Sequence, residues 1–395
     1  MLFQTLDDKN ECVMAYYKDK LSAQLPQLPT ATWNYTSFLE KIENIDYAQL
    51  YCGGKTLDEV CPASIRAEWE ESYKRLKAYY RSMREAKLNL EEHCFFDMVP
   101  RKFLIDYCKV KNKITNHVLA VYEKPENYDF LLSLKKVTSE IRYKKINVNV
   151  AALKDRMHEE RVRQFCKKHR HNNHYIKYDM FGTKTGRLST QKGSFPILSM
   201  DKSYRKILKP SNDWFVEFDF NAAELRVLLG LLGKAQPPED IHEWNLKNVF
   251  KDTCTREEVK KRTFAWLYNP ESQDNLLNEM YDREGVVKKY YDGKQVTTVF
   301  NRTIPADTHH ALNYIIQSTA ADMFLRQMIK VKESLEGKDS YIAFSLHDSI
   351  VLDFSEKNMR DLVKLKEVFE DTQFGKLLVN VSAGKSFGEM KKIKI

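Results

Sequence analysis

The chain has 395 residues, enough for two or three units that each bury a core, and 43% of them are hydrophobic, which excludes disorder over most of its length. Its 64 Lys and Arg outnumber 55 Asp and Glu, and the net charge of +9 favours a polyanionic partner, although a basic soluble enzyme explains the charge equally well. The first residues lack a signal-peptide pattern, and no apolar run approaches the roughly 18 residues of a membrane span, so neither secretion nor membrane contact is expected.

The cysteines give a prediction about the redox environment. There are seven, an odd number, and no two of them form a C-x-x-C pair. This pattern predicts free thiols in a reducing cytoplasm. The residues concerned are Cys12, Cys52, Cys61, Cys94, Cys108, Cys166 and Cys254.

The N-terminal 60 residues have mixed patterns to which we assign no chemistry. Residues 11–21 (ECVMAYYKDKL) predict a short strand leading to a turn, and residues 30–42 (TATWNYTSFLEKI) begin like a capped helix. From about residue 63 to 150 the pattern is helical, with a long amphipathic stretch at 67–90 that carries Lys and Arg at its polar positions. We expect a lobe of packed helices there, while residues 181–210 read as loops and short strands because they are rich in Gly and Pro.

Residues 213–220 (DWFVEFDF) alternate as a strand does, with Phe215, Glu217 and Asp219 on one face and Val216, Phe218 and Phe220 on the other. The acidic side cannot be buried without a cation or solvent. An apolar helix is expected to follow, with Asn221 as its N-cap and Glu224 three residues later. Asp219 would therefore lie where a strand ends and a helix begins.

A basic and aromatic helix is predicted at residues 256–268. Thr255 and Glu258 have the spacing of a capping box, and Pro270 after Asn269 ends the pattern. A single stripe along this helix holds two cations followed by two aromatic residues: Arg256, Lys260, Phe264 and Tyr268. Such a stripe suits a ligand with a charged tail and a flat ring, because the cations can bind phosphates and the aromatics a base or sugar.

Residues 341–346 (YIAFSL) and 350–354 (IVLDF) predict a hairpin with Asp348 at its tight turn. Two strand ends can bring the distant carboxylates of Asp219 and Asp348 together. Two carboxylates that share divalent cations, with a basic helix for a triphosphate, are the groups that phosphoryl transfer from a nucleoside triphosphate requires.

At these residues the chain resembles the A family of DNA polymerases, from about residue 178 to the C-terminus. Six blocks occur in the family's order: TKTGRLST, DFNAAELR, DIHEW, REEVKKRTFAWLYN, ALNYIIQSTAADMF and HDSIVLDF. The resemblance implies an α+β right-hand polymerase fold with palm, fingers and thumb. The expected division is an N-terminal segment of unknown role (1–60), a helical thumb-like region (61–177), the first part of the palm (178–231), the fingers (232–307) and the second part of the palm (308–395).

The resemblance also implies template-directed addition of dNMP units from dNTPs to a primer 3′-hydroxyl, as in DNA replication, with two Mg²⁺ ions. Asp219, Asp348 and the backbone carbonyl of Phe220 would bind the metals. The expected nucleotide-binding residues are Arg256, Lys260, His242, Phe264, Tyr268 and Glu224, of which Lys260 is also catalytic and Glu224 excludes a ribose 2′-hydroxyl. The expected contacts to primer-template DNA are Arg187, Asn313, Gln317 and His347.

Several of these residues have plain structural alternatives. Glu224 could be a capping partner, His242 a hydrogen-bonded residue at a helix start, and Asn313 with Gln317 polar residues of a helix surface. Several positions depart from the family's pattern: Ala222 and Ala223 replace Gln and Ile, and the family's duplex-contacting N-L-Q-N-I-P segment is present only as SFPIL. Ser349 replaces a Glu after the hairpin Asp, with Glu217 as a candidate substitute, and Asn269 replaces a Gly, in a turn where Asn can adopt the left-handed conformation.

No Asp-x-Glu motif, with which the family's 3′-5′ exonuclease begins, occurs in the first 180 residues. We therefore expect a polymerase without its own proofreading, of bacteriophage type, in the cytoplasm of a host if viral, with a separate exonuclease or processivity factor as a further partner. Two alternatives stay open. A single-subunit RNA polymerase also has an H-D-S hairpin, although Glu224 and the TGRLS block argue against it, and a catalytically silent DNA-binding protein could keep the fold, although Asp219, Asp348 and Lys260 are intact.

Overall fold

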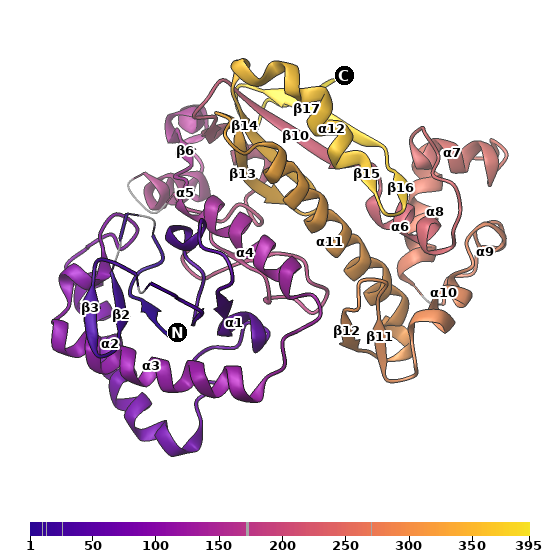
Figure 1. Cartoon of the computed structure of the whole chain (residues 1–395). Helices are drawn as coiled ribbons and strands as arrows, with labels where there is room; N and C mark the ends of the chain where they lie inside the picture. Colours follow the sequence, from indigo (N-terminus) through magenta and orange to yellow (C-terminus); the bar gives the residue numbers. More distant parts are fainter. Residues whose placement is uncertain (10, 13, 26, 171–173, 270) are drawn as a thin grey trace. The chain divides into compact units, whose positions relative to one another are not determined.

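The computed structural model describes residues 1–9, 11–12, 14–25, 27–170, 174–269 and 271–395. The chain forms two compact units, Met1–Lys144 and Lys145–Ile395 (Figure 1). The division falls inside the range expected to be thumb-like, so that residues 145–177 belong to the second unit. The assignments to thumb, palm and fingers stay predictions. None of the described helices has the length and apolar character that a membrane span requires.

The first unit combines a small antiparallel sheet with long helices. Its sheet has the order β1 (Gln4–Thr5), β2 (Ala15–Tyr17) and β3 (Lys20–Ser22). The helices are α1 (Ala48–Tyr51), α2 (Arg66–Glu85), α3 (Arg101–Val121) and α4 (Tyr128–Tyr143). Trp69 of α2 is 2% exposed and packs against Val110, Ile114 and Val118 of α3, which confirms the expected lobe of packed helices.

Of two short segments predicted in this unit, one is confirmed and the other is wrong. The strand and turn expected in residues 11–21 are confirmed by the β2–β3 hairpin, in which Tyr17 pairs with Lys20. The capped helix expected at 30–42 is wrong: β4 (Ala31–Thr32) pairs in parallel with β5 (Asp46–Tyr47), and only the 3-10 turn η1 (Ser37–Leu39) follows. Thr36 does cap this turn, since its hydroxyl accepts a hydrogen bond from the Phe38 amide. Pairing with β5 keeps Ala31 and Thr32 extended, and no local sequence pattern predicts this pairing.

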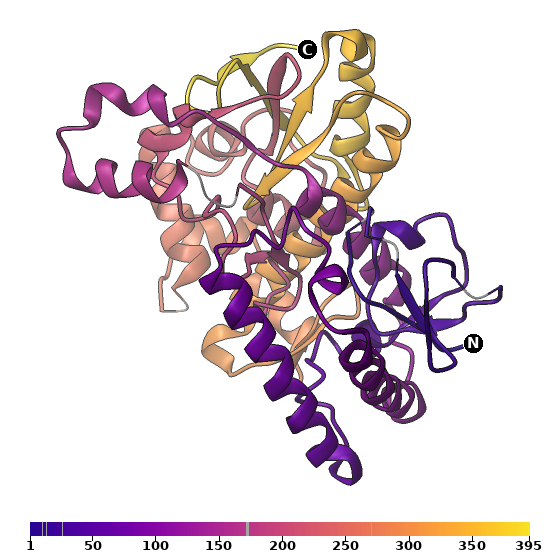
Figure 2. The ribbon, with the colours of Figure 1, turned by 90° about the vertical axis from the view of Figure 1, so that its left-hand side faces the viewer.

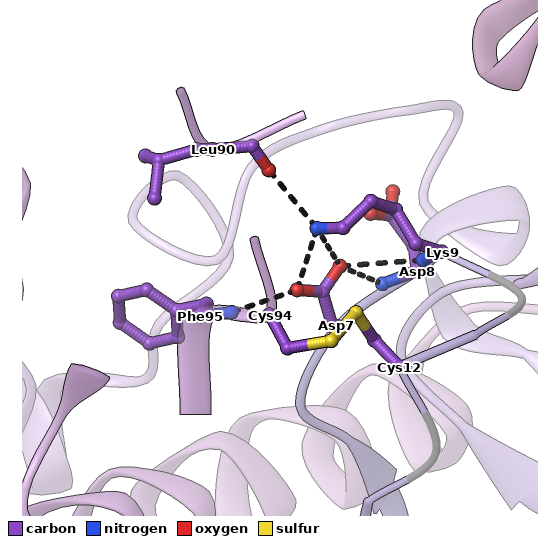
Figure 3. The surroundings of a disulfide bond; sticks show 7 residues. All are labelled: Asp7, Asp8, Lys9, Cys12, Leu90, Cys94 and Phe95. Atoms are coloured by element: carbon purple, nitrogen blue, oxygen red, sulfur yellow. Dashed lines mark hydrogen bonds and ion pairs between the residues drawn. A yellow bond between two sulfur atoms is a disulfide. The ribbon is translucent and has the colours of Figure 1, made fainter. Parts of the chain in front are cut away.

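The expectation that all cysteines are free thiols is also wrong, because Cys12 and Cys94 form a disulfide (Figure 3). Beside it, Asp7 accepts hydrogen bonds from the Lys9 ammonium at 2.7 Å and from the Phe95 amide at 3.0 Å. Lys9 and Asp7 are both buried, with side chains 6% and 5% exposed, so their charges compensate each other. Sequence spacing does not reveal this pairing, since 82 positions separate the two cysteines and only folding brings them together.

The second unit is organised around a five-stranded antiparallel sheet with the order β13-β14-β10-β17-β18. The bounds are β10 Trp214–Phe220, β13 Tyr341–Leu346, β14 Ser349–Phe354, β17 Val379–Gly384 and β18 Lys391–Ile393. β10 lies at the centre because its residues are buried or half-buried on both faces, and it pairs with β14 on one side and β17 on the other. The strand over 213–220 and the hairpin around Asp348 are thereby confirmed.

Helices cover one face of this sheet, and ring contacts identify the face. Phe220 stacks on Phe369 of α12 (Leu362–Glu370) with centroids 4.3 Å apart, and Phe324 of α11 (Thr308–Ser334) meets the same ring at 6.2 Å. Figure 1 shows α11 and α12 lying along the sheet. Because side chains alternate along a strand, the covered face is that of Val216, Phe218 and Phe220, and Asp219 points to the other face.

The remaining helices of the second unit are α5 (Glu160–His169), α6 (Ala223–Leu231), α7 (Ile241–Asn248), α8 (Arg256–Tyr268), α9 (Asn275–Met280) and α10 (Arg283–Tyr290). The short strands are β6 (Asn147–Val148), β7 (Tyr178–Asp179), β8 (Ser189–Thr190), β9 (Leu208–Lys209), β11 (Gln295–Thr297), β12 (Thr303–Pro305), β15 (Asp371–Thr372) and β16 (Gly375–Lys376). The 3-10 turns besides η1 are η2 (Ala63–Ile65) and η3 (Phe95–Met98) in the first unit, and η4 (Val150–Arg156), η5 (Lys202–Ile207) and η6 (Glu356–Asp361) in the second.

The start of the basic helix α8 is as predicted, and its end is followed by an extended residue. The capping box of α8 is confirmed, since Thr255 accepts from the Glu258 amide and Glu258 accepts from the Thr255 amide. Asn269 follows the helix in an extended conformation with φ −105° and ψ 107°, and so does not use the left-handed conformation that Asn allows. Pro270 lies outside the described residues.

Candidate active site

The two expected metal-binding carboxylates meet at the ends of adjacent strands. Asp219, near the end of β10, is paired with Ser349, the first residue of β14, and Asp348 precedes Ser349 in the turn. The charges are close enough to interact: burial, and then the neighbouring carboxylates of Glu217 and Asp348, raise the pKa of Asp219 to about 7. Burial also raises the pKa of Asp348, against an opposing effect of Arg187.

The backbone around both aspartates is in an uncommon conformation. Ala222, three residues after Asp219, has φ 49°, and His347, immediately before Asp348, has φ 55°. Residues other than glycine in this left-handed region cost on the order of 1 kcal/mol or more and persist where the surrounding fold imposes them. At Ala222 the chain leaves β10 and enters α6, and at His347 it turns from β13 into β14. The two turns fix where the carboxylates emerge.

The helix start after Asp219 differs from the prediction. Ala222, not Asn221, is the N-cap of α6, and it makes no side-chain cap. Asn221 instead donates to the Asp240 carboxylate at 2.8 Å and accepts from the Ile241 amide at 3.1 Å. The prediction failed because a nearby helix, α7, competes for this side chain, and that contact is tertiary. Asn221 thus ties the end of β10 to the start of α7.

The same start of α7 holds the first cation of α8. The Asp240 carboxylate caps α7 by accepting from the His242 and Glu243 amides, and it also accepts from Arg256 at 2.8 Å. Burial opposes the charge of Asp240, but hydrogen bonds from Arg256 and Asn221 outweigh it and hold the pKa of Asp240 well below its usual range. Asp240 belongs to the DIHEW block but is not among the residues predicted to act in the site. Its position as a Ser/Thr/Asp/Asn residue before a helix was the available signal.

The two aromatic residues of the stripe on α8 contact each other, and His242 contacts one of them. Phe264 and Tyr268 stack with ring planes 6° apart, and the ring of His242 meets Phe264 at 5.7 Å. Lys260 is exposed, and the described residues give it no carboxylate partner. His242 lies at the start of α7, as expected if it were only a hydrogen-bonded residue at a helix start. Its buried Nδ1, however, has no hydrogen-bond partner in the described residues, so a capping role does not explain the ring.

Glu224 and Arg187 form an ion pair. The Glu224 side chain is 10% exposed, and burial raises its pKa while Arg187 opposes that effect. The alternative of Glu224 as a capping partner is therefore not what the structure has. The loop that carries Arg187 is fixed at Gly186, whose φ is 78° and whose missing Cβ would lie 2.5 Å from the guanidinium carbon of Arg302. A side chain at position 186 would require the guanidinium of Arg302 to move, although it is ion-paired to Asp322 at 2.6 Å.

The other residues expected to contact DNA are on α11 and in the turn that carries Asp348. Asn313 and Gln317 are half-buried on α11, and His347 is exposed in the hairpin turn. Asn313 lines a cavity of about 330 Å³ together with Leu267 and Tyr268 of α8 and Arg283 of α10. No described contact joins the α8 stripe directly to Asp219 or Asp348, and the link between the two groups runs through Asn221 and Asp240.

The donor set fits divalent cations. Two carboxylates at neighbouring strand ends repel each other when both are charged, and a bound cation removes that repulsion. Carboxylate oxygens with a backbone carbonyl, as at Phe220, are the ligands that Mg²⁺ prefers. Among the described residues no group of three or more His, Cys, Asp or Glu side chains is arranged to hold a metal. Asp219 and Asp348 would be the two acidic ligands, with Glu217 close by on the strand face of Asp219.

Two further residues next to Asp219 were not foreseen. Asn380 pairs with Asp219 from β17, and a hydrogen bond from its side chain opposes the rise in the pKa of Asp219. Lys392 of β18 acts in the same direction through its charge. Only the strand order reveals them, because β17 and β18 follow Asp219 by more than a hundred residues.

Comparison with known proteins finds similarity to DNA polymerases. Residues 272–389 match the family model described as DNA polymerase family A. The chain is 24% identical over 265 residues to DNA polymerase I of Borreliella burgdorferi and 23% identical over 276 residues to DNA polymerase I of Chloroflexus aurantiacus. These alignments cover 53% and 55% of the chain but only 29% of each relative, so the chain spans less than a third of their length.

A solved structure described as the POL domain of Pol1 from M. smegmatis, in complex with DNA primer-template and dNTP, matches the fold with a TM-score of 0.62. The match covers 91% of this chain and 86% of that chain at 14% identity. The expected fold class, the α+β right-hand polymerase fold, is thereby confirmed.

Proposed function

We propose that the chain is a DNA-directed DNA polymerase, a proposal that the match of residues 272–389 to the model of DNA polymerase family A supports. It would add dNMP units to a primer 3′-hydroxyl in the order set by a template, releasing pyrophosphate. The observation that supports this best is the meeting of Asp219 and Asp348 at the paired ends of β10 and β14, on the sheet face that α11 and α12 leave uncovered.

Different residues of the site would bind the metal ions, the triphosphate, and the sugar and base. Asp219, Asp348 and the carbonyl of Phe220 would hold two Mg²⁺ ions, which when bound supply charge for activating the primer hydroxyl and for the leaving pyrophosphate. Lys260 and Arg256 would bind the triphosphate with the help of His242, whose ring meets that of Phe264. Phe264 and Tyr268 would face the sugar and base, since their stacked rings form a flat apolar surface.

The primer-template would be contacted by Arg187, Asn313, Gln317 and His347. The finer expectations also stay proposals: a bacteriophage-type enzyme without its own 3′-5′ exonuclease, a separate exonuclease or processivity factor as partner, and a cytoplasmic location. The M. smegmatis polymerase domain was solved in complex with primer-template DNA and dNTP, and this supports the choice of substrates.

A primer-extension assay tests the proposal. With a primer-template, Mg²⁺ and either dNTPs or rNTPs, we expect dNTP-dependent, template-directed extension. Asp219→Asn and Asp348→Asn should each lower kcat by about a thousandfold or more, because each removes several kcal/mol of charge stabilisation. Asp252→Asn, an exposed acid with φ 58° that Asn also tolerates, is the matched control.

The contrary outcomes are distinct. Preferred rNTP incorporation without a primer would identify an RNA polymerase, and DNA binding without synthesis would identify a silent protein of the same fold. The two Asp→Asn variants should keep or raise the melting temperature, since they remove repulsion between buried acids. A loss of synthesis with an unchanged fold therefore reports on the site.

A further inference from the structure

A basic projection of the second unit lies away from the proposed nucleotide-binding helix. It consists of η4 (Val150–Arg156) and α5 (Glu160–His169). In Figure 1, α5 and β6 lie on the opposite side of the central sheet from α7 and α8, and Figure 2 shows the magenta part of the chain that includes α5 standing out from that sheet.

The inner face of α5 accounts for its attachment. Val162 and Cys166 are buried, Phe165 packs against Tyr204 of η5 with ring centroids 4.8 Å apart, and His169 meets Phe195 at 5.2 Å. These residues lie on one side of the helix because they recur at three- and four-residue spacing. The opposite side is left to solvent.

All the acids of this projection are neutralised within the second unit. Asp155 pairs with Lys206 at 3.0 Å, Glu159 pairs with Arg156 at 2.6 Å, and Glu160 pairs with Arg163. Five exposed cations remain for which the described residues provide no carboxylate: Lys154, Arg161, Lys167, Lys168 and Arg170. We call these five residues the α5 cation face.

Helix stability alone does not explain this charge. Cations in the last turn of a helix favour its negative end, which accounts for Lys167 and Lys168. Arg161 lies in the first turn, where a cation opposes the helix dipole, and Lys154 lies in η4. Like charges held close together without counter-charges destabilise a surface, so a polyanion that neutralises them would bind favourably.

We propose that the α5 cation face binds the phosphate backbone of duplex DNA outside the active site. The choice of DNA rests on the proposed function. Duplex rather than single-stranded DNA fits because unpaired bases bind by stacking on aromatic side chains. Residues 150–170 contain no Tyr or Trp, and the ring of Phe165 is already packed between Tyr204 and His169. Charge without stacking surfaces suits a backbone whose bases are paired.

The test uses the full chain and a pair of matched double variants. Arg161→Gln/Lys168→Gln removes an Arg and a Lys that lie seven positions apart on the outer side of α5. Arg360→Gln/Lys364→Gln removes the same residue types from η6 and α12, where both are exposed as well. Binding of a blunt 30-base-pair duplex is measured by fluorescence anisotropy between 50 and 200 mM KCl, without nucleotide.

We expect the α5 variant to bind the duplex at least about fivefold more weakly at 50 mM KCl, and the slope of log K against log salt to fall by about 1 for each phosphate that is no longer neutralised. The control variant should stay within about twofold of the wild type, since both variants lose the same net charge and only one loses the α5 cation face. An α5 variant that binds like the control, in affinity and in salt slope, overturns the proposal.

Two more probes distinguish duplex DNA from other polyanions that could bind the α5 cation face. Single-stranded DNA of 30 nucleotides and vesicles with phosphatidylserine are measured in the same way, and a loss confined to either of them overturns the duplex assignment. Extension at saturating primer-template separates this proposal from the polymerase activity. The α5 variant should extend as the wild type does, whereas a wild type that cannot extend any primer rejects the proposed function and leaves the duplex comparison to be judged by binding alone.

Discussion

The hydroxyl of Ser349 donates a hydrogen bond of 3.0 Å to the carboxylate of Glu217 across the β10–β14 pair. Ser349 stands directly opposite Asp219, and Glu217 shares the strand face of Asp219 two residues earlier. The acid that the family's pattern has after the hairpin Asp is thus replaced by a serine that holds another acid from the central strand. Burial raises the pKa of Glu217, while Ser349 and then Arg205 oppose that effect and favour the charged form.

The first prediction is that Glu217 supplies auxiliary negative charge to the metal site. Glu217→Ser should lower Mn²⁺ affinity about tenfold, as loss of a charge several ångströms from a cation implies at a protein surface. Adding Ser349→Glu to Glu217→Ser should restore most of the affinity, because position 349 pairs directly with Asp219. Electron paramagnetic resonance of Mn²⁺ binding measures this without any turnover.

Glu367→Gln, an exposed acid on α12, serves as the control for that experiment and should leave Mn²⁺ affinity unchanged. A Glu217→Ser variant that binds Mn²⁺ as tightly as the wild type would show that Glu217 is only a structural partner of Ser349 and Arg205.

The second prediction concerns the sugar. Glu224 is held by Arg187, so its carboxylate has a defined position rather than a solvated one. Glu224→Ala should raise the ratio of rNTP to dNTP incorporation at least tenfold, because it opens the space that a 2′-hydroxyl needs and discrimination of a few kcal/mol is typical of such contacts. Glu224→Gln, which keeps the volume, should change the ratio much less. Steady-state incorporation of matched rNTP and dNTP pairs measures both, and equal ratios for Glu224→Ala and the wild type would contradict the assignment.

The third prediction distinguishes the two cations of α8. Arg256 is already paired with Asp240, whereas Lys260 is exposed without a carboxylate partner in the described residues. Lys260→Met should lower kcat/KM for dNTPs by about 10- to 100-fold, the effect of one charge-assisted hydrogen bond. Arg256→Met should cost less, since binding a triphosphate requires Arg256 to leave an existing ion pair. Lys261→Met, the exposed neighbour on α8, should behave as the wild type, and a larger effect at Arg256 than at Lys260 would reverse the order we expect.

The fourth prediction is a thiol count. Of seven cysteines, Cys12 and Cys94 are bonded and five are free: Cys52, Cys61, Cys108, Cys166 and Cys254. Titration with a thiol reagent in denaturant, without reductant, should find five thiols, and seven after reduction. Cys12→Ser under the same conditions should yield six, because Cys94 is released. Seven thiols in the unreduced wild type would show that the two sulfurs stay reduced.

The fifth prediction concerns pH. Burial lowers the pKa of His169 from 6.5 to about 4, with a smaller effect from Lys168 and His174. Between pH 4 and 6.5 the His169 side chain is protonated in the unfolded chain but neutral in the folded chain. The stability that the neutral His169 contributes is therefore fully present above pH 6.5 and is lost as the pH falls toward 4. His169→Phe, which keeps the ring contact with Phe195, should reduce the loss of unfolding free energy between pH 6.5 and 4.5. Urea unfolding at both pH values measures this, and identical pH dependence of variant and wild type would contradict the buried neutral state.

Local sequence was sufficient for several elements of the site. The capping box at Thr255, the alternation around Asp219 and the hairpin around Asp348 all depend on residues within a few positions of one another, and all three are confirmed. Local signals failed where a distant element competed. Asn221 bonds to Asp240 instead of capping α6, and Thr32 pairs with Tyr47 in parallel strands instead of entering a helix.

The acids and cations of the site, and the strand, helix and hairpin that carry them, could all be predicted from local patterns along the chain, and so could the resemblance to one fold. Their partners became known from the folded chain alone: Glu217 with Ser349, Glu224 with Arg187, Arg256 with Asp240, and Cys12 with Cys94. The physical reason is that periodicity and capping depend on neighbours along the chain, whereas hydrogen bonds and ion pairs form between whichever groups the packing of strands and helices brings within about 3 Å.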